Sequence, residues 1–381
     1  MRTLQFRAAL LALLVNGGAF AAPPLAAEKL TVEPLPPPGP HWVYVVDEAF
    51  FNEIDARVRL FDGDSYRHLG QIDAGFSPGV IESPDGSTTA VTTTYYARGG
   101  HGARTDVVEF TDNSTLATAG EIVLPPKRAQ IPPTLFNLAY STDARFLYVS
   151  YITPAGSFGV LDPKDKTVLD EIDTAGCVLV IASGPNRVSS FCDSGRLLTV
   201  TLDSQGHEAA RALSEVLFNP DDDPIFVQGV PTANGYAFVS FLGQMHEVDF
   251  SGAQPSIHAP WSLVSAGERG RWRPGGTQVA AIHRQLGRLY VPMHRGGEGS
   301  HKQGGSEIWV FDLNTHRRLA RWPMAASHIG PVTAVQVSQD ASPVLFAGSD
   351  DGAVGVLDAL TGQLRHLDKN LGQTPWMFLS P

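Results

Sequence analysis

Short, mostly apolar runs recur along the whole chain, and each is bounded by turn-forming residues. Residues 146–150, 235–240 and 307–312 are examples, and they are rich in β-branched and aromatic side chains. Such side chains favour extended strands, and the Gly, Pro, Asn and Asp residues between the runs favour tight turns. The best helical candidate is short and lies around residues 53–57. The pattern therefore predicts an all-β protein.

The predicted strands are organised as a repeat. A unit begins with a turn, often Ser-x-Asp-Gly or Ser-x-Asp-Ala, as at residues 83–86, 141–144 and 338–341, and a later strand ends in an apolar residue followed by Asp. These aspartates are about 40 to 65 residues apart, which is the spacing of four-stranded propeller blades. The strand-ending acids are Asp62, Asp112, Asp162, Asp203, Asp249, Asp312 and Asp358.

Seven units predict a single seven-bladed β-propeller domain over residues 41–381. A lone four-stranded sheet leaves both faces and its edges exposed, whereas sheets arranged radially bury their faces against one another and protect most edges. We expect the strand before Asp62 to pair with the C-terminal blade and close the ring.

The N-terminus has the composition of an export signal. Arg2 and Arg7 flank an apolar run at residues 8–15, and small residues follow. This predicts a signal peptide at residues 1–27, too short for a permanent membrane anchor, and then a flexible Pro- and Ala-rich lead-in at residues 28–40. Because no later stretch is apolar enough to span a bilayer, we expect a soluble periplasmic protein without a membrane partner.

Charge and cysteine content narrow the choice of partners. The chain has 28 basic and 39 acidic side chains and a formal net charge of -11, which argues against nucleic acid as a partner. Its two cysteines, Cys177 and Cys192, have the spacing of a short closed loop and no metal-binding companions. In an exported chain the expected state is one disulfide, which contributes on the order of 3 kcal/mol. Two separate buried thiols are the alternative.

A search for a self-sufficient active site yields little. The chain has no GxSxG, HExxH or P-loop motif. His283, His294 and His301 could form a metal site, but we favour loop histidines in solvent or in hydrogen bonds. The acids at 221–223 fit a strand-entry turn better than a calcium site, and residues 350–352 fit a hairpin turn. A propeller without a recognisable catalytic motif is expected to present a binding surface to another chain.

Several segments resemble the heavy subunit of the tryptophylquinone-dependent amine dehydrogenases. The most specific is Trp-Arg-Pro-Gly-Gly at residues 272–276, followed by residues 287–290 and 307–312, and the cysteine pair also matches. The resemblance covers roughly residues 40 to 370. Residues 124–128 and 222–226 are more similar to the aromatic (aralkylamine) type than to the methylamine type.

The resemblance implies a division of labour between two kinds of chain. The heavy subunit pairs with a small, disulfide-rich light subunit, two of each, and the light subunit carries both the tryptophan tryptophylquinone cofactor and the catalytic base. Primary amines become aldehyde and ammonia, and electrons pass to a blue-copper protein such as azurin or amicyanin. This chain would then hold no cofactor, no metal and no catalytic residue.

The resemblance also implies that a phenylalanine near the start of the propeller borders the amine's entry. Phe50 matches the aromatic type better, and Phe51 matches the methylamine type better. A rigid aromatic ring offers a dry face to the alkyl or aryl part of an amine. The alternative is that these are ordinary core residues.

Two other functions compete with a dehydrogenase subunit. One is a stand-alone periplasmic propeller that binds proteins as a scaffold. The other is a lactonase-like hydrolase with a central metal, which would need acids and histidines that converge at the inner strand ends.

Overall fold

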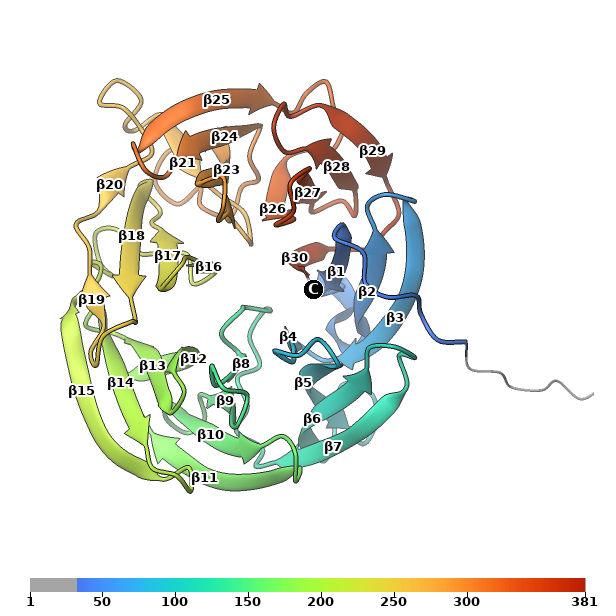
Figure 1. The fold of residues 1–381 in the computed structure, drawn as a ribbon, viewed down its shortest axis with the longest axis vertical. Coiled ribbons are helices and arrows are strands. Elements are labelled where there is room, and N and C mark those ends of the chain that lie inside the picture. Colours follow the sequence, from blue (N-terminus) through green and yellow to red (C-terminus); the bar gives the residue numbers. More distant parts are fainter. Residues whose placement is uncertain (1–32, 381) are drawn as a thin grey trace, which may run out of the picture. The chain divides into compact units, whose positions relative to one another are not determined.

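The computed structural model describes residues 33–380, so the predicted signal peptide at 1–27 lies outside the described residues. Seven antiparallel sheets surround a central axis (Figure 1). The one helical element in the described part of the chain is η1 (Phe50–Asp55), a short 3-10 segment. The all-β, seven-bladed β-propeller prediction is confirmed.

Each sheet is numbered here in the order in which the chain enters it, and most have four strands. The first sheet contains β1 (Trp42–Asp47), β2 (Ala56–Asp62), β3 (Arg67–Gly75) and β30 (Pro375–Leu379); the second β4 (Gly79–Glu82), β5 (Thr88–Tyr96), β6 (Arg104–Asp112) and β7 (Thr118–Leu124); the third β8 (Leu138–Tyr140), β9 (Leu147–Tyr151), β10 (Ser157–Asp162) and β11 (Thr167–Asp173); and the fourth β12 (Cys177–Gly184), β13 (Arg187–Cys192), β14 (Arg196–Leu202) and β15 (Glu208–Val216).

The remaining three sheets complete the ring. The fifth contains β16 (Val230–Pro231), β17 (Gly235–Val239), β18 (Gln244–Asp249), β19 (Ser256–Ile257) and β20 (Trp261–Ser262); the sixth β21 (Trp272–Pro274), β22 (Ala281–His283), β23 (Arg288–Arg295), β24 (Glu307–Asp312) and β25 (Arg317–Pro323); and the seventh β26 (Val332–Val337), β27 (Val344–Ser349), β28 (Val354–Asp358) and β29 (Leu364–Asp368).

Burial falls from the inner strands to the outer ones. All six residues of β27 are buried, whereas the outermost strand of the sixth sheet, β25, has only exposed and half-buried residues. An inner strand has a neighbouring sheet on both sides, so both of its faces are apolar. In β1, for example, Val43 and Val45 pack against Phe346 and Phe378 on one side, and Tyr44 packs towards the second sheet on the other.

The ring is closed by the C-terminal strand. Strand β30 pairs with β1 in antiparallel fashion, from Tyr44 opposite Leu379 to Asp47 opposite Pro375. The closing partner is therefore β1, one strand earlier than β2, which ends at Asp62. Both edges of β2 are already taken by β1 and β3, so β1 offers the free edge.

The strand-ending aspartates fold the turn from the third strand to the fourth. Asp112 at the end of β6 accepts hydrogen bonds from the backbone N–H groups of Ser114 and Thr115, both at 2.9 Å. Asp358 at the end of β28 does the same for residues 360 and 361. These side-chain-to-backbone bonds are the turn chemistry that the repeat predicted. The predicted flexible segment 28–40 is described only from residue 33, and Leu35 there donates its N–H to the carbonyl oxygen of Ser114.

Candidate functional site

The connections divide between two ends of the sheets. In an antiparallel meander, the connections from the second to the third strand and from the fourth strand to the next sheet share one end. Residues 50–55, 76–78, 97–103, 125–137 and 369–374 lie at this end, which we call the η1 face. The Ser-x-Asp turns and the strand-ending aspartates lie at the opposite end, which we call the turn face.

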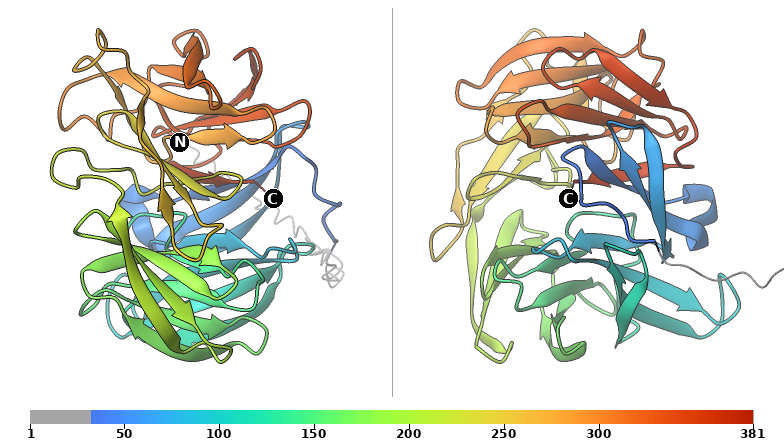
Figure 2. Two further views of the ribbon diagram at one scale, coloured as in Figure 1. Left: turned by 60° about the vertical axis from the view of Figure 1, so that its left-hand side comes forward. Right: turned by 45° about the vertical axis from the view of Figure 1, so that its right-hand side comes forward.

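Element η1 lies beyond the ends of β1 and β2 (Figure 2). It carries a group of exposed apolar side chains. The side chains are 44% exposed at Phe50, 96% at Phe51 and 48% at Ile54. The Phe50 ring stacks on Trp376, with centroids 6.2 Å apart and planes 4° from parallel. Phe51 meets the edge of Phe50 at 5.6 Å. The alternative that both phenylalanines are core residues is therefore wrong.

Asp47 fixes the start of η1 against the last interblade connection. Its buried carboxylate accepts N–H groups from Gln373 and Thr374, the closest at 2.7 Å, and pairs with Arg59 at 3.3 Å. The next turn begins at Ala49, which is held in the left-handed region at φ 48°. The anchor ties the exposed phenylalanines to the strand that closes the ring.

Glu48 is a buried carboxyl group directly below η1. One of its oxygens accepts a hydrogen bond from Ser77 at 3.4 Å, and the other has no partner within residues 33–380. Burial raises the pKa of Glu48 to about 8, and the negative charges of Glu53 and Asp47 act in the same direction. The Ser77 bond and the charge of Arg128 oppose the rise in pKa. The proton-bearing form of Glu48 is therefore favoured at neutral pH.

A buried arginine joins two connections of the η1 face to each other and to the second sheet. Arg128 donates to the carbonyl oxygens of Phe76 at 2.7 Å and Ser77 at 2.6 Å, and to the Thr94 hydroxyl at 2.9 Å. Its backbone N–H donates to the buried carboxylate of Asp106. Burial lowers the pKa of Arg128 to about 10, so its side chain stays charged at neutral pH. This network holds the segments around η1 in one arrangement.

The connection 125–137 lies across the central axis. The carbonyl oxygen of Pro133 accepts hydrogen bonds from Trp376 Nε1 at 3.0 Å and from Gln228 Nε2 at 2.9 Å. Thr277 donates its hydroxyl to the carbonyl oxygen of Trp376 at 2.6 Å. Trp376 is therefore held through its side chain by the connection 125–137 and through its backbone by Thr277, and Gln228 holds the same connection from the segment before β16.

A second aromatic group lies on the η1 face, over the fifth and sixth sheets. His301 stacks on Phe241, with centroids 4.0 Å apart, and Phe226 packs against Phe241. His294 hydrogen bonds to Ser300 at 3.0 Å. Burial lowers the pKa of both histidines, so the neutral forms are favoured.

The three histidines considered for a metal site do not converge. His283 lies at the turn face and its Nε2 is 2.9 Å from the carbonyl oxygen of Asp340. Over residues 33–380, no three His, Cys, Asp or Glu side chains are grouped as a metal ion would require. Asp223 accepts a hydrogen bond from the Ser240 hydroxyl at 2.7 Å and another from the Leu242 N–H, so it holds the connection between β17 and β18. Its own N–H donates to the carbonyl oxygen of Asn219 in a turn, after which Ile225 forms one isolated bridge to Ser240.

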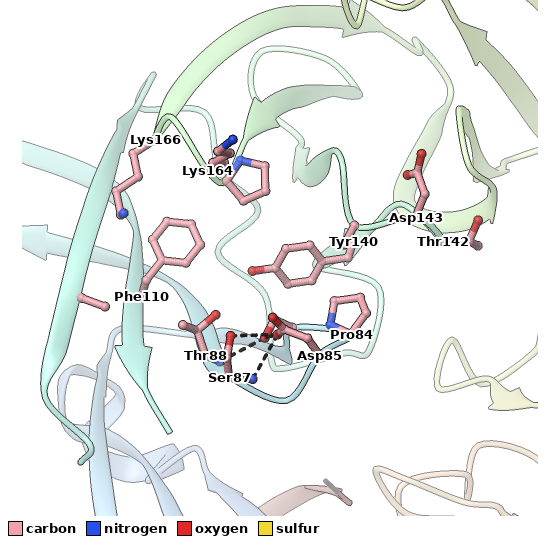
Figure 3. A pocket seen from close by; sticks show the side chains of 14 residues that line it. Pro84, Asp85, Ser87, Thr88, Phe110, Tyr140, Thr142, Asp143, Lys164 and Lys166 are labelled. Atoms are coloured by element: carbon pink, nitrogen blue, oxygen red, sulfur yellow. Dashed lines mark hydrogen bonds between the residues drawn. The ribbon is translucent and has the colours of Figure 1, made fainter. Parts of the chain in front are cut away.

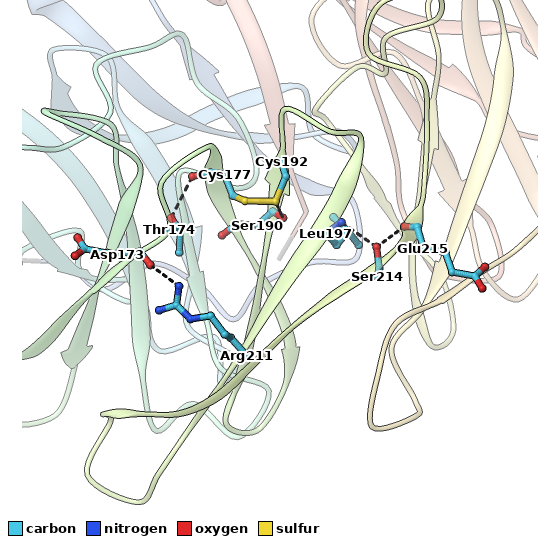
Figure 4. Close-up of a disulfide and its surroundings, with 9 residues drawn as sticks. All are labelled: Asp173, Thr174, Cys177, Ser190, Cys192, Leu197, Arg211, Ser214 and Glu215. Atoms are coloured by element: carbon cyan, nitrogen blue, oxygen red, sulfur yellow. Dashed lines mark hydrogen bonds between the residues drawn. A yellow bond between two sulfur atoms is a disulfide. The ribbon is translucent and has the colours of Figure 1, made fainter.

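The two cysteines form a disulfide within the fourth sheet (Figure 4). Cys177 and Cys192 are direct partners in the register of β12 and β13. Thr174 also donates its hydroxyl to the carbonyl oxygen of Cys177, at 3.1 Å. The bridge therefore staples a hairpin, as the sequence predicted, and the alternative of separate thiols is wrong.

Two cavities lie away from η1. One of about 620 Å³ opens at the turn face between the second and third sheets, and Phe110, Tyr140, Lys164 and Lys166 are among its lining residues (Figure 3). Another of about 280 Å³ lies at the inner strand ends, and Glu82 is the one carboxyl side chain among the residues that line it. This lining does not provide the converging acids and histidines that a lactonase-like site would need.

The Trp-Arg-Pro-Gly-Gly segment at residues 272–276 has a structural role in the packing of two sheets. Trp272 is buried in β21, with the guanidinium groups of Arg295 and Arg321 over its ring at 5.3 and 4.5 Å. A Cβ atom at Gly276 would lie 2.2 Å from the carbonyl oxygen of Thr333. The segment therefore joins the sixth sheet to the seventh through a close backbone approach that needs glycine.

Trp376, Glu48 and Arg128 belong to the site and were not singled out from the sequence. Trp376 and Phe50 are more than 320 residues apart, and only ring closure brings them together. Glu48 is an ordinary glutamate in its local sequence. Its position directly after an apolar strand was the one feature of the sequence that indicated burial.

The fold and the site define a seven-bladed β-propeller with an exposed, stacked aromatic group on its η1 face. A family model described as methylamine dehydrogenase heavy chain matches residues 40–380. The chain therefore belongs to the methylamine dehydrogenase heavy chain family and is the heavy subunit of an amine dehydrogenase.

Individual relatives agree with this assignment. The chain is 29% identical over 354 residues to the methylamine dehydrogenase heavy chain of Paracoccus versutus, covering 92% of this chain and 81% of that one. It is 25% identical over 367 residues to the heavy chain of Methylobacillus flagellatus, covering 95% and 90%. A solved dihydro-heme d1 dehydrogenase is similar with a TM-score of 0.54 and 17% identity, covering 89% of this chain and 66% of that one, which shows the fold alone. The matches do not separate the aromatic from the methylamine type.

Proposed function

We propose that this chain is the non-catalytic heavy subunit of a periplasmic enzyme, built from two heavy and two light chains, that deaminates primary amines. A primary amine and water give an aldehyde, ammonia, two protons and two electrons. The light subunit supplies the tryptophan tryptophylquinone and the catalytic base, and the electrons leave to a blue-copper protein such as azurin or amicyanin. The heavy chain docks the light subunit and forms one wall of the amine channel.

The exposure of Phe50 and Phe51 is the observation that carries the proposal. Exposure of large aromatic side chains to water is unfavourable, and a partner that covers them lowers the free energy of the system. Such residues dominate binding at interfaces. Membership of a family of heavy chains supports a light chain as that partner. The same rings would give the amine a dry surface next to the partner's chemistry.

The compartment is part of the proposal. An export signal at residues 1–27, outside the described residues, would carry the chain to the periplasm. The Cys177–Cys192 disulfide supports this, because such bonds persist in oxidising compartments. The resemblances at residues 124–128 and 222–226 support an aromatic amine as the preferred substrate.

Alanine substitution tests the channel wall. In the assembled enzyme, Phe50→Ala and Phe51→Ala should change the preference among amines of increasing chain length, because a narrow apolar wall is removed. The ratio of kcat/KM values for methylamine, butylamine and 2-phenylethylamine measures this preference. Tyr66→Ala is the matched control, since Tyr66 is 37% exposed and lies on the turn face. If both phenylalanine variants keep the original preference among amines, the proposal that Phe50 and Phe51 line the amine channel is wrong.

A stand-alone periplasmic scaffold was the competing function. Membership of the heavy chain family argues against it, because no observation in the described residues favours a scaffold over a dehydrogenase subunit.

A further inference from the structure

We infer that Trp376 is a positioning residue that sets where the Phe50 ring stands, and that it thereby sets the amine selectivity of the enzyme. The inference rests on the proposed function. The selectivity wall would then consist of two parallel rings from opposite ends of the chain, Phe50 from η1 and Trp376 from the closing strand.

Element η1 alone does not fix the Phe50 ring. All six of its residues are exposed or half-buried, and its backbone is interrupted at Asn52, where φ is -147° and ψ is 55°. The Phe50 N–H has a long hydrogen bond of 3.4 Å to the Thr374 hydroxyl. The near-parallel face of Trp376 is therefore the main surface that orients the Phe50 side chain.

Trp376, in contrast, is held at both its side chain and its backbone. Its Nε1 donates to Pro133, its carbonyl oxygen accepts from Thr277, and its neighbours Pro375 and Met377 pair with β1. These contacts come from three parts of the propeller, namely the connection 125–137, the sixth sheet and β1, and together they fix the position of the indole. The closing strand thus fixes the position of Trp376, and the stacking contact with Trp376 in turn fixes the orientation of the Phe50 ring.

The assembled enzyme provides the first test. Trp376→Leu should change the ratio of kcat/KM for 2-phenylethylamine over methylamine by about tenfold, the size expected for loss of an aromatic pair. The change should lie in KM, with kcat retained, because the chemistry belongs to the light chain. Trp376→Phe keeps a ring for stacking and should restore most of the ratio.

A matched tryptophan separates positioning from general stability. Trp261 is also half-buried, stacks on His316 at 4.4 Å and donates its Nε1 to Glu247, but it lies in the fifth sheet. Trp261→Leu should leave the ratio unchanged. If Trp376→Leu lowers kcat for all amines alike, or leaves the ratio at its original value, the inference is wrong.

A second readout needs no light chain. In the full chain with 4-fluorophenylalanine at position 50, the fluorine resonance should move towards that of an exposed ring in Trp376→Leu and stay in place in Trp261→Leu. A resonance that does not move would overturn the positioning role even in an active enzyme. If the unaltered protein oxidises no amine, the proposed function and the selectivity claim fail together, while this resonance still decides whether Trp376 orients Phe50.

Discussion

At the scale of single residues, the site depends on groups whose environment differs from what their sequence neighbours indicate. Asp47 and Glu48 are adjacent acids at the end of an apolar strand. Both are buried, but their surroundings are opposite. Asp47 receives several N–H groups and an arginine, whereas Glu48 keeps one oxygen without a partner in the described chain. Burial of a carboxyl group without compensation favours its protonated form.

The ionisation of Glu48 should make the protein less stable at alkaline pH. Because its folded pKa is about 8 and its ordinary value is 4.5, the folded state binds the extra proton between these two values. Its contribution is complete below about pH 4.5 and is lost as the pH rises through about 8, at a cost on the order of a few kcal/mol. In the Glu48→Gln variant, the free energy of unfolding should therefore depend less on pH between about 4.5 and 8.

Denaturant unfolding at a series of pH values between 5 and 9 measures this effect. The exposed Glu121 provides the control, since Glu121→Gln should leave the curve unchanged. If Glu48→Gln follows the same pH curve as the unaltered protein, the assignment of a high pKa to Glu48 is wrong.

At the scale of elements, local sequence patterns predicted the strands and turns well. They predicted the contacts between distant segments poorly. The Asp-ended strands and Ser-x-Asp turns are local, because an aspartate such as Asp112 satisfies N–H groups only two or three residues away. The hairpin that carries Cys177 and Cys192 is equally local. The position of the Phe50 ring, in contrast, is not determined locally. Its stacking partner belongs to the last strand, and no local sequence pattern indicates such a stack.

The disulfide should stabilise its hairpin by restricting the unfolded chain. Cys177 and Cys192 are separated by 15 positions, and a loop of that size corresponds to about 3 kcal/mol in the loop-entropy model. The double variant Cys177→Ser with Cys192→Ser should therefore lower the free energy of unfolding by about that amount. Guanidinium titrations with and without reductant measure it.

The reductant supplies the control for this prediction. Reduced unaltered protein should match the double serine variant, and the variant itself should not respond to reductant. Equal stability of the oxidised and reduced forms would contradict a structural role for the bridge.

At the scale of the whole molecule, ring closure converts seven marginal sheets into one cooperative domain. The seven-fold repeat predicted the ring and its closure from spacing alone, but it assigned the closing contact one strand too late. Strand β30 fills the inner edge of the first sheet, and Phe378 packs between the first and seventh sheets. The η1 face is therefore assembled only when the ring closes, because Trp376 belongs to the closing strand.

Removal of the closing strand should open the ring. Deletion of residues 375–381 exposes the inner edge of β1 and uncovers the apolar side chains that Phe378 touches, so the protein should lose its single cooperative unfolding transition. Small-angle scattering should show a larger radius of gyration. Deletion of residues 380–381 alone is the control and should change neither quantity. A cooperative, equally compact product after the longer deletion would contradict the closure argument.

The central claim is that the η1 face holds a second chain that bears the chemistry, and native mass spectrometry of the protein purified from its own cells tests it most directly. The account predicts a complex of two copies of this chain with two copies of a small, disulfide-rich chain, with a quinone absorbance that bleaches when a primary amine is added. A lone monomer without that chromophore would contradict it.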